Sequence, residues 1–338
     1  DLPQTRAVRG GLNRSSFDET SEALFLTSGY AYNSAEEAEA TFKGESAHFQ
    51  YSRFGNPTVS MFQDRLAALE GAEACIATAT GMSAVFYALL ALLKAGDRIG
   101  AARQLFGSCF FIINDLLPKY GIKGEFVDGG DLTQWEQALS TPAQAVLFES
   151  PSNPMLDIVD VRAVCDLAHK AGAKVVLDNA FATPILQRPL EFGADVVVHS
   201  ATKFYGGHSD VLAGVVVGSH ALLGPIEAFR RRTGGILGPD AAWLLQRSFP
   251  TMDLRIDAAQ QAAAQLAAAL AEEVVSAGIL VNAVAPSILD TPANRAAMPN
   301  GDHTRWPKVE EVAATIAFLA SPDNKVTRGG VVPVYGKS

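Results

Sequence analysis

The stretch VVVHSATKFYGGHSDVLAGVVVG, residues 196–218, decides the fold of this chain. Two valine-rich runs enclose a segment that holds one lysine, Lys203, followed by a glycine pair. Short valine-rich runs are typical of strands that are buried on both faces of a mostly parallel sheet. In open α/β sheets, ligands collect beyond the carboxyl ends of such strands. The stretch therefore predicts an α/β fold with Lys203 at the edge where a ligand would bind.

The surrounding sequence repeats the same alternation of short apolar strands and amphipathic helices. Strands are predicted at 97–102, 143–149, 173–178, 195–200 and 211–218, and helices at 81–96, 111–121 and 160–172. This order predicts a doubly wound α/β fold, with a mostly parallel sheet and helices on both faces. Farther on, the pattern predicts an Ala-rich helix at 254–277, a strand at 279–285, a helix at 309–321 and a strand at 329–336. Whether these last strands extend the main sheet or form a separate layer stays open.

Composition excludes several classes of protein. The 338 residues are 48% apolar with a net charge of −9, and the basic residues are scattered, which argues against a nucleic-acid footprint. No apolar run approaches the ~20 residues of a membrane helix, and the first residues lack the apolar segment of a signal peptide. The three cysteines fit neither disulfide nor zinc spacing, so we expect reduced thiols, no metal and a cytoplasmic protein.

Polar side chains follow three of the predicted strands. The strands end in FESPSNP, VVLDNAFATP and VVVHSATK, which place Asn153, Asp178 and Lys203 at the same edge of a parallel sheet. Upstream, ATGMSAV places Gly81 at the start of a helix, where free backbone N–H groups bind phosphate. An amine, a carboxylate and a phosphate cradle are together what pyridoxal phosphate requires. The amine forms a Schiff base, and the carboxylate keeps the pyridine nitrogen protonated so that the ring accepts electrons.

Each of these residues has a simpler explanation when taken alone. A lysine after a strand is usually a solvated surface residue, Asp178 could cap a turn, and Gly81 could be an ordinary turn glycine. The sequence SATK also matches the S-x-x-K pattern of serine acylases, but there the serine opens a helix, whereas Ser200 ends a predicted strand. The occurrence of the amine, the carboxylate and the phosphate cradle together at the ends of consecutive strands favours the cofactor site.

Residues 1 to about 260 resemble the Cys/Met-metabolism family of pyridoxal-phosphate enzymes, which includes cystathionine γ-synthase and γ-lyase. The likeness is greatest to its O-succinylhomoserine sulfhydrylase branch. The matching segments are TRAVRGG, ETSEALFLTSGYAYNSAEEAEATFKGE, YSRFGNPTVSMFQDRLAALEGAEACIATATGM, FGSC, ESPSNPMLDIVD, DNAFATPILQRPLEFGADVVVHSATK and GGHSDVLAGVVVG. The segment KFYGGHSD is more similar to the synthase and lyase branches.

The resemblance implies a pyridoxal-phosphate fold type I domain and a role for each matching residue. It implies Lys203 as the Schiff-base lysine, Asp178 as the partner of the pyridine nitrogen and Asn153 as the neighbour of the phenolic oxygen. The remaining implied cofactor ligands are Gly81, Met82, Ser200 and Thr202 around the phosphate, Phe106 stacked on the ring where many members have tyrosine, and Tyr51 and Arg53 reaching the phosphate of a neighbouring subunit.

The resemblance also implies a reaction and an assembly. The expected reaction is γ-replacement on O-succinylhomoserine or O-acetylhomoserine by sulfide, which gives homocysteine. The expected partners are these small molecules and further copies of the chain, in a homodimer or homotetramer. Alternatives are cystathionine γ-synthase or γ-lyase chemistry, and a catalytically silent protein that binds the cofactor. The predicted domains are an N-terminal arm at 1–60, a cofactor domain at 61–255 and a C-terminal α/β segment at 256–338.

The C-terminal segment resembles a different family. Residues 262–338, including LAAALAEEVVSAGILVNAVAPSILDTPANRAAMP and VEEVAATIAFLASPDNKVTRGGVVPVYG, are similar to the Rossmann-like end of a short-chain dehydrogenase/reductase. PSILDT corresponds to the P-G-x-x-x-T loop of that family, with Ser287 in place of glycine and Thr291 at its end. The changeover falls within the Ala-rich helix, so the chain resembles a chimera.

Oxidoreductase activity is not expected from this second resemblance. The glycine-rich T-G-x-x-x-G-x-G turn is absent, and so is the Tyr-x-x-x-Lys pair, since Tyr205 is followed at that spacing by Ser209. The arginine with which the first family grips a substrate α-carboxylate has no recognisable counterpart either, although Arg295, Arg305 and Arg328 are present. We therefore expect weak turnover.

Overall fold

The structure is a computed structural model that describes residues 3–154, 156–286, 295 and 303–334. The chain divides into two compact units, Asp1–Asp253 and Leu254–Ser338. No helix in the described ranges is long and apolar enough to cross a membrane.

The first unit is built on a seven-stranded sheet with the order β1-β7-β6-β5-β4-β2-β3. Strand β7 runs antiparallel to both of its neighbours, and the other adjacent strands are parallel. The strands are β1 (Ala74–Thr78), β2 (Arg98–Ala102), β3 (Lys123–Val127), β4 (Ala145–Glu149), β5 (Lys174–Asp178), β6 (Val196–Ser200) and β7 (Gly214–Gly218). The predicted mostly parallel sheet is confirmed, although β1 and β3 were not among the predicted strands.

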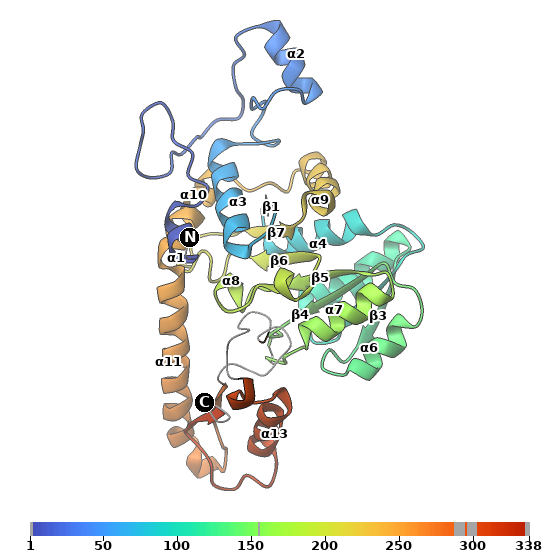
Figure 1. Cartoon of the computed structure of the whole chain (residues 1–338), viewed down its shortest axis with the longest axis vertical. Helices are drawn as coiled ribbons and strands as arrows, with labels where there is room; N and C mark the ends of the chain where they lie inside the picture. The colour runs from blue at the N-terminus through green and yellow to red at the C-terminus, as the bar shows by residue number, and fades with distance from the viewer. Residues whose placement is uncertain (1–2, 155, 287–294, 296–302, 335–338) are drawn as a thin grey trace. The chain divides into compact units, whose positions relative to one another are not determined.

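Helices lie on both faces of this sheet (Figure 1). Helices α4 and α9 pack against β1 and β7 on one face, and α7 and α6 pack on the other face, against β5 and β3. The helices are α1 (Pro3–Arg9), α2 (Ala35–Lys43), α3 (Pro57–Glu70), α4 (Gly81–Leu92), α5 (Gly107–Phe111), α6 (Leu132–Leu139), α7 (Val161–Lys170), α8 (Thr183–Leu186), α9 (His220–Thr233) and α10 (Pro239–Ser248), with shorter turns η1 (Ile112–Leu116), η2 (Leu117–Tyr120), η3 (Pro189–Phe192) and η4 (Phe249–Thr251).

Two predicted helices end differently from expectation. Helix α4 stops at Leu92, because Leu93 is extended, and Gly96 instead forms the left-handed turn (φ 93°) into β2. The predicted helix at 111–121 is broken into α5, the π-helical turn η1 and the 3₁₀ turn η2. Pro118 lacks a backbone N–H and cannot continue the α-helical hydrogen-bond ladder, which accounts for the break near this point.

The core on the α4 face is formed by alternate residues of the central strands. Leu147, Val176 and Val198, from β4, β5 and β6, are fully buried in one cluster with Leu89 of α4. Burying a side chain of this size contributes roughly 1.5–3 kcal/mol. Side chains alternate between the two faces of a strand, so the residue two positions after each of these points to the same face, at the carboxyl edge of the sheet.

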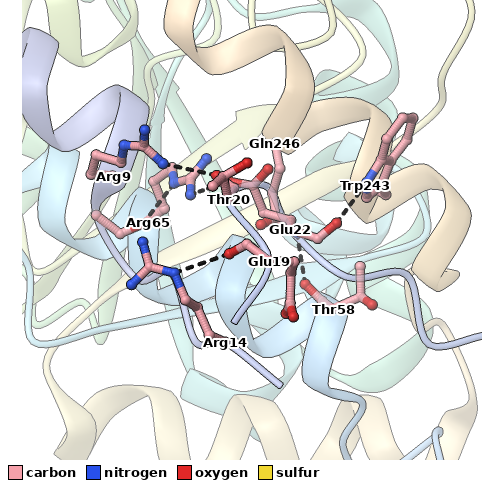
Figure 2. Close-up of polar contacts among 10 residues, drawn as sticks. Arg9, Arg14, Glu19, Thr20, Glu22, Thr58, Arg65, Trp243 and Gln246 are labelled. Atoms are coloured by element: carbon pink, nitrogen blue, oxygen red, sulfur yellow. Dashed lines mark hydrogen bonds and ion pairs between the residues drawn. The ribbon is translucent and has the colours of Figure 1, made fainter. Parts of the chain in front are cut away.

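The N-terminal segment is fastened to α3 and α10. Arg65 of α3 is fully buried, donates a hydrogen bond from Nε to the carbonyl of Gly10 at 2.6 Å and pairs with Glu22 (Figure 2). Trp243 of α10 donates from Nε1 to the carbonyl of Glu22 at 3.1 Å. The segment that follows, which contains α2, extends away from the sheet in Figure 1. The start of the arm is therefore held in place against α3 and α10.

The second unit contains most of α11 (Met252–Glu273), then η5 (Val275–Ala277), β8 (Ala283–Pro286), η6 (His303–Arg305), α13 (Val309–Ala320) and β9 (Val331–Val334). β8 and β9 pair in parallel as a two-stranded sheet of their own. This resolves the alternative left open by the sequence in favour of a separate layer. Ser287 and Thr291, in the loop expected to resemble a dehydrogenase, lie outside the described residues.

Candidate active site

Three polar side chains end neighbouring strands on the α4 face of the sheet. Glu149, the last residue of β4, lies directly opposite Asp178, the last residue of β5. Asp178 in turn lies opposite Val198 of β6, and Ser200 ends that strand two residues later. By strand alternation, Glu149, Asp178 and Ser200 share the face that packs on α4. The fold thus gathers them at one edge of the sheet.

The amino end of α4 meets β6 at a glycine. A Cβ added at Gly81 would lie 2.8 Å from the Cβ and 2.9 Å from the Cα of Ser200, closer than real Cβ atoms come. Next to it, a Cβ at Gly214 of β7 would lie 2.1 Å from the carbonyl oxygen of Thr80. Glycine is required at both positions, because the turn between β1 and α4 rests directly on the strands that follow it.

This helix end presents backbone donors. The first N–H groups of a helix have no acceptor within the helix, and the helix dipole makes this end positive. Thr80 caps α4, since its hydroxyl accepts a hydrogen bond from the Ser83 N–H at 3.0 Å. The N–H groups of Gly81 and Met82 belong to the same first turn, beside Ser200. Together they form an anion cradle of the kind that binds phosphate.

Lys203 lies in the turn that follows β6. Its side chain is exposed, and the turn is closed by backbone hydrogen bonds from the Lys203 N–H to Ser200 at 3.1 Å and from the Gly207 N–H to Lys203 at 2.8 Å. Thr202 is engaged with the next strand, since its hydroxyl donates to the carbonyl of Ala213 at 3.2 Å and accepts from the Ala213 N–H at 3.0 Å. The amine is therefore presented to solvent from a well-fixed turn.

Asp178 is a carboxyl group in an environment that disfavours its charge. Burial raises its pKa, while a hydrogen bond from the Ala180 N–H at 3.0 Å and the field of His199 lower it in part. A carboxylate in such a place is stabilised in its charged form by a nearby cation. A protonated pyridine nitrogen would supply this cation.

The sequence reasoning missed Glu149. This side chain is 3% exposed, and one of its oxygens, Oε2, accepts hydrogen bonds from the N–H groups of Phe106 at 3.1 Å and Asn153 at 3.2 Å. Burial, and then the charge of Asp178, raise its pKa to about 7. The sequence signal that could have pointed to this residue, though not to its role, is an acidic residue at the end of the apolar run AVLF.

The backbone N–H groups of Phe106 and Asn153 both donate to the carboxyl group of Glu149. Phe106 precedes α5 and is 43% exposed, and Asn153 lies in the loop after β4. Both segments border the strand ends where Asp178 and Ser200 lie. An aromatic ring and an amide are therefore held at the same edge of the sheet.

Tyr51 and Arg53 are held elsewhere in the single chain. Arg53 donates from Nη1 to the carbonyl of Arg231 on α9 at 2.5 Å, and its guanidinium lies 4.8 Å from the ring centre of Phe54. Tyr51 is 45% exposed and forms an isolated bridge with Gly29. No contact recorded among the described residues joins this pair to the strand-end cluster.

The residues at the strand ends fit pyridoxal phosphate. Gly81 leaves no room for a side chain between the α4 donors and Ser200, which suits a phosphate, and Asp178 is a carboxyl group that a ring N–H would stabilise. Together with the sheet order and the single antiparallel strand, these features define an α/β enzyme of the pyridoxal-phosphate fold type I class.

Two family models match the chain. The model of the Cys/Met metabolism PLP-dependent enzymes matches residues 4–284, and the chain belongs to this family. A second model, described as enoyl-(acyl carrier protein) reductase, matches residues 241–336. The two matches overlap over residues 241–284, which include α11, and they confirm both resemblances; the changeover within α11 stays a prediction.

Curated relatives match between about two thirds and four fifths of the chain. An O-succinylhomoserine sulfhydrylase of Mycobacterium tuberculosis is 53% identical over 264 residues, 78% of this chain and 65% of that protein. A protein of the same name from Pseudomonas aeruginosa is 41% identical over 263 residues, and an L-methionine gamma-lyase of Pseudomonas putida is 42% identical over 236 residues. The chain thus spans just under two thirds of the length of these relatives.

Solved structures have the same fold. A Campylobacter jejuni protein described as an O-acetylhomoserine (thiol)-lyase, with N′-pyridoxyl-lysine-5′-monophosphate, superposes with a TM-score of 0.71 at 27% identity, covering 75% of this chain and 72% of that one. A cystathionine gamma synthase of Xanthomonas oryzae pv. oryzae gives a TM-score of 0.70 at 34% identity, covering 75% and 64%.

Proposed function

We propose that this chain binds pyridoxal phosphate at the strand ends, with Lys203 as its covalent attachment point and Asp178 beside the ring nitrogen. The observation that carries the proposal is the contact between Gly81 and Ser200, which brings the α4 donors to the edge that Asp178 shares. The N–H groups of Gly81 and Met82 and the hydroxyl of Ser200 would hold the phosphate.

Further residues would complete the binding of the cofactor. Phe106 would stack on the ring, and Asn153 would lie beside the phenolic oxygen. Thr202 holds the lysine turn through two hydrogen bonds with Ala213, and it would contribute to the binding of the phosphate. When bound, pyridoxal phosphate supplies an aldehyde that joins amines and a ring that accepts electrons.

The proposed reaction is γ-replacement on O-succinylhomoserine or O-acetylhomoserine. The bond between the substrate's γ-carbon and the acyloxy oxygen breaks, the carboxylate leaves, and hydrosulfide forms a bond to the same carbon to give homocysteine. Lys203 would remove the proton from the α-carbon as general base. Asp178 would hold a proton on the ring nitrogen of the cofactor. The support for this reaction over others in the family is the 53% identity to a named O-succinylhomoserine sulfhydrylase.

The active assembly is proposed to be a homodimer or a pair of dimers. Tyr51 and Arg53 lie on the N-terminal arm of the first unit, which exposes large apolar side chains, among them Phe42 at 72% and Leu26 at 69%. In a dimer these side chains would be covered, and the arm would reach the phosphate of the neighbouring copy.

A second candidate function follows from the second family match. Residues 241–336 match a reductase model instead of the end of a Cys/Met enzyme. This observation favours a protein that binds pyridoxal phosphate but turns over substrate slowly or not at all.

One experiment tests the cofactor assignment and separates it from turnover. Purified protein supplied with pyridoxal phosphate should turn yellow, and borohydride should fix the cofactor on the peptide that contains Lys203, as located by mass spectrometry. A Lys203→Ala variant should lose this linkage, whereas Lys174→Ala, at an exposed lysine paired with Asp195, should keep it. Attachment to another lysine would overturn the assignment. Homocysteine formation from O-succinylhomoserine and sulfide is then measured separately.

A further inference from the structure

The carboxyl group of Glu149 has no role in the function proposed above, although it lies at the centre of the site. It ends β4 directly opposite Asp178 and is 3% exposed. Its Oε2 atom accepts two backbone hydrogen bonds, from Phe106 at 3.1 Å and from Asn153 at 3.2 Å. A buried acidic group that joins two functional segments is more than a packing residue.

The two hydrogen bonds link segments that are distant in the sequence. Phe106 follows β2 and Asn153 follows β4, and 47 positions separate them in the numbering. Loops after strands are held by few backbone contacts, so an acceptor at the end of β4 fixes both to the rigid sheet. Since Oε2 alone accepts both N–H groups, Oε1 remains available for a proton.

The charges around Glu149 favour its protonated form. The titratable groups that act on it in the described chain are Asp178 on β5 and Cys109 on α5. Burial and the two carboxyl groups raise the pKa of the Cys109 thiol, so this group stays neutral. On the other side of β4, strand β2 ends in Ala101 and Ala102. Two carboxyl groups so close together in a buried site do not both ionise easily. With a ring N–H beside Asp178, the negative charge is more stable on Asp178 than on Glu149.

We propose that Glu149 is a positioning residue of the cofactor site, in which Oε2 holds the Phe106 and Asn153 segments in place and Oε1 carries a proton. The carboxyl pair formed with Asp178 then has one negative charge, which matches the single positive charge of a protonated ring nitrogen. This inference rests on the proposed cofactor site for its functional meaning, but the protonation of Glu149 can be tested without the cofactor.

The variants separate the two parts of the proposal. Glu149→Gln keeps an oxygen that accepts from both N–H groups but cannot ionise, whereas Glu149→Ala removes the acceptor. Glu136→Gln, at an exposed residue of α6, is the matched control for the loss of one carboxyl group. Far-ultraviolet circular dichroism establishes that each variant is folded.

The first measurement uses the protein without cofactor. The pKa of Glu149 is raised from 4.5 to about 7 in the folded chain, so the folded state binds more protons than the unfolded state between these values. Its contribution to stability is therefore present below that window and lost as pH rises through it. The urea midpoint of the unmodified chain should fall relative to that of Glu149→Gln from about pH 5 to about pH 8. Parallel pH dependence in the two proteins would overturn the assignment of the proton.

The second measurement is the dissociation constant of pyridoxal phosphate. At about pH 5.5 the unmodified chain and Glu149→Gln should bind alike, since both have a neutral side chain. At about pH 8.5 the unmodified chain has an extra negative charge near an anionic ligand and should bind three- to tenfold more weakly than Glu149→Gln, by an order-of-magnitude Coulomb argument. Taking the ratio of the two proteins cancels the titration of the cofactor itself.

Glu149→Ala completes the test. It should bind the cofactor about tenfold more weakly than Glu149→Gln at both pH values, because both loops lose their acceptor. Equal affinities for Glu149→Ala and Glu149→Gln would overturn the positioning role. If the unmodified chain bound no pyridoxal phosphate, the proposed function would fail, whereas the urea series would still decide whether Glu149 is protonated.

Discussion

Replacing Gly81 with alanine tests the phosphate cradle most directly. The new Cβ would lie 2.8 Å from the Cβ and 2.9 Å from the Cα of Ser200, and a backbone atom cannot swing aside as a flexible side chain can. The first turn of α4 must therefore move away from β6. Losing one charge-assisted hydrogen bond to the phosphate costs roughly 1.5–3 kcal/mol, so the dissociation constant of pyridoxal phosphate should rise about ten- to a hundredfold.

The assay and its control follow from the same geometry. Cofactor affinity is measured by titrating the protein with pyridoxal phosphate and following its visible absorbance. Gly224→Ala is the control, because Gly224 lies in α9 with no atom within 4 Å of the added Cβ. This variant should keep its affinity and gain up to about 1 kcal/mol of stability from helix propensity. An unchanged dissociation constant in folded Gly81→Ala protein would refute the placement of the phosphate at this helix end.

Three other predictions concern charge, assembly and stability. Asp178→Asn keeps an acceptor for the Ala180 N–H but removes the charge, so turnover should fall by orders of magnitude while borohydride still fixes the cofactor; near-normal turnover would contradict the assigned role. Mixing Arg53→Ala with Lys203→Ala subunits should restore part of the activity of an active parent, as measured by homocysteine formation, and inactive mixed dimers would rule out a shared site. Glu70→Ala removes a carboxyl group that lies 2.6 Å from fully buried His199 and accepts from the Tyr205 hydroxyl at 3.0 Å, so urea denaturation should show a loss of roughly 1–3 kcal/mol, and unchanged stability would contradict the buried polar contact.

The central strands and the edge at which Asp178 and Lys203 lie were predictable from the sequence. The valine runs of β5 and β6 are buried on both faces, so their pattern is unambiguous; Asp178 is the last residue of β5, and Lys203 lies three residues after Ser200, which ends β6. Strand β3, with the sequence KGEFV, could not be predicted because it is an edge strand with three exposed residues, one of which is a glycine. Its position depends on pairing with β2, which no local pattern reveals.

The role of Glu149 could not be read from the sequence for a similar reason. Its hydrogen bonds to Phe106 and Asn153 depend on how two loops fold back over the end of β4, and its raised pKa depends on Asp178 in the next strand. The antiparallel direction of β7 also follows from tertiary pairing with β1 and β6. Local patterns predict which residues end a strand, whereas the interactions between strand ends follow only from the sheet order.

The C-terminal part of the chain matches a different family model from the rest. We therefore predict that cofactor binding and turnover are separable in this chain. The groups proposed to hold pyridoxal phosphate all precede residue 210 and lie in the first compact unit. Arg295, Arg305 and Arg328 lie in the second unit and are exposed, in a segment that matches the reductase model. None of them stands in the sequence context of an arginine that grips an α-carboxylate.

Without a bidentate arginine, a substrate carboxylate loses a charge-assisted pair worth roughly 1.5–3 kcal/mol, about ten- to a hundredfold in affinity. The α-carbon is then also less well aligned with Lys203, and the rate of proton removal depends on this alignment. We therefore expect full cofactor loading, with kcat/KM for O-succinylhomoserine at least tenfold below that of an intact relative assayed side by side. Equal values would mean that an arginine of the second unit grips the carboxylate, and alanine variants of Arg295, Arg305 and Arg328 would then identify which one.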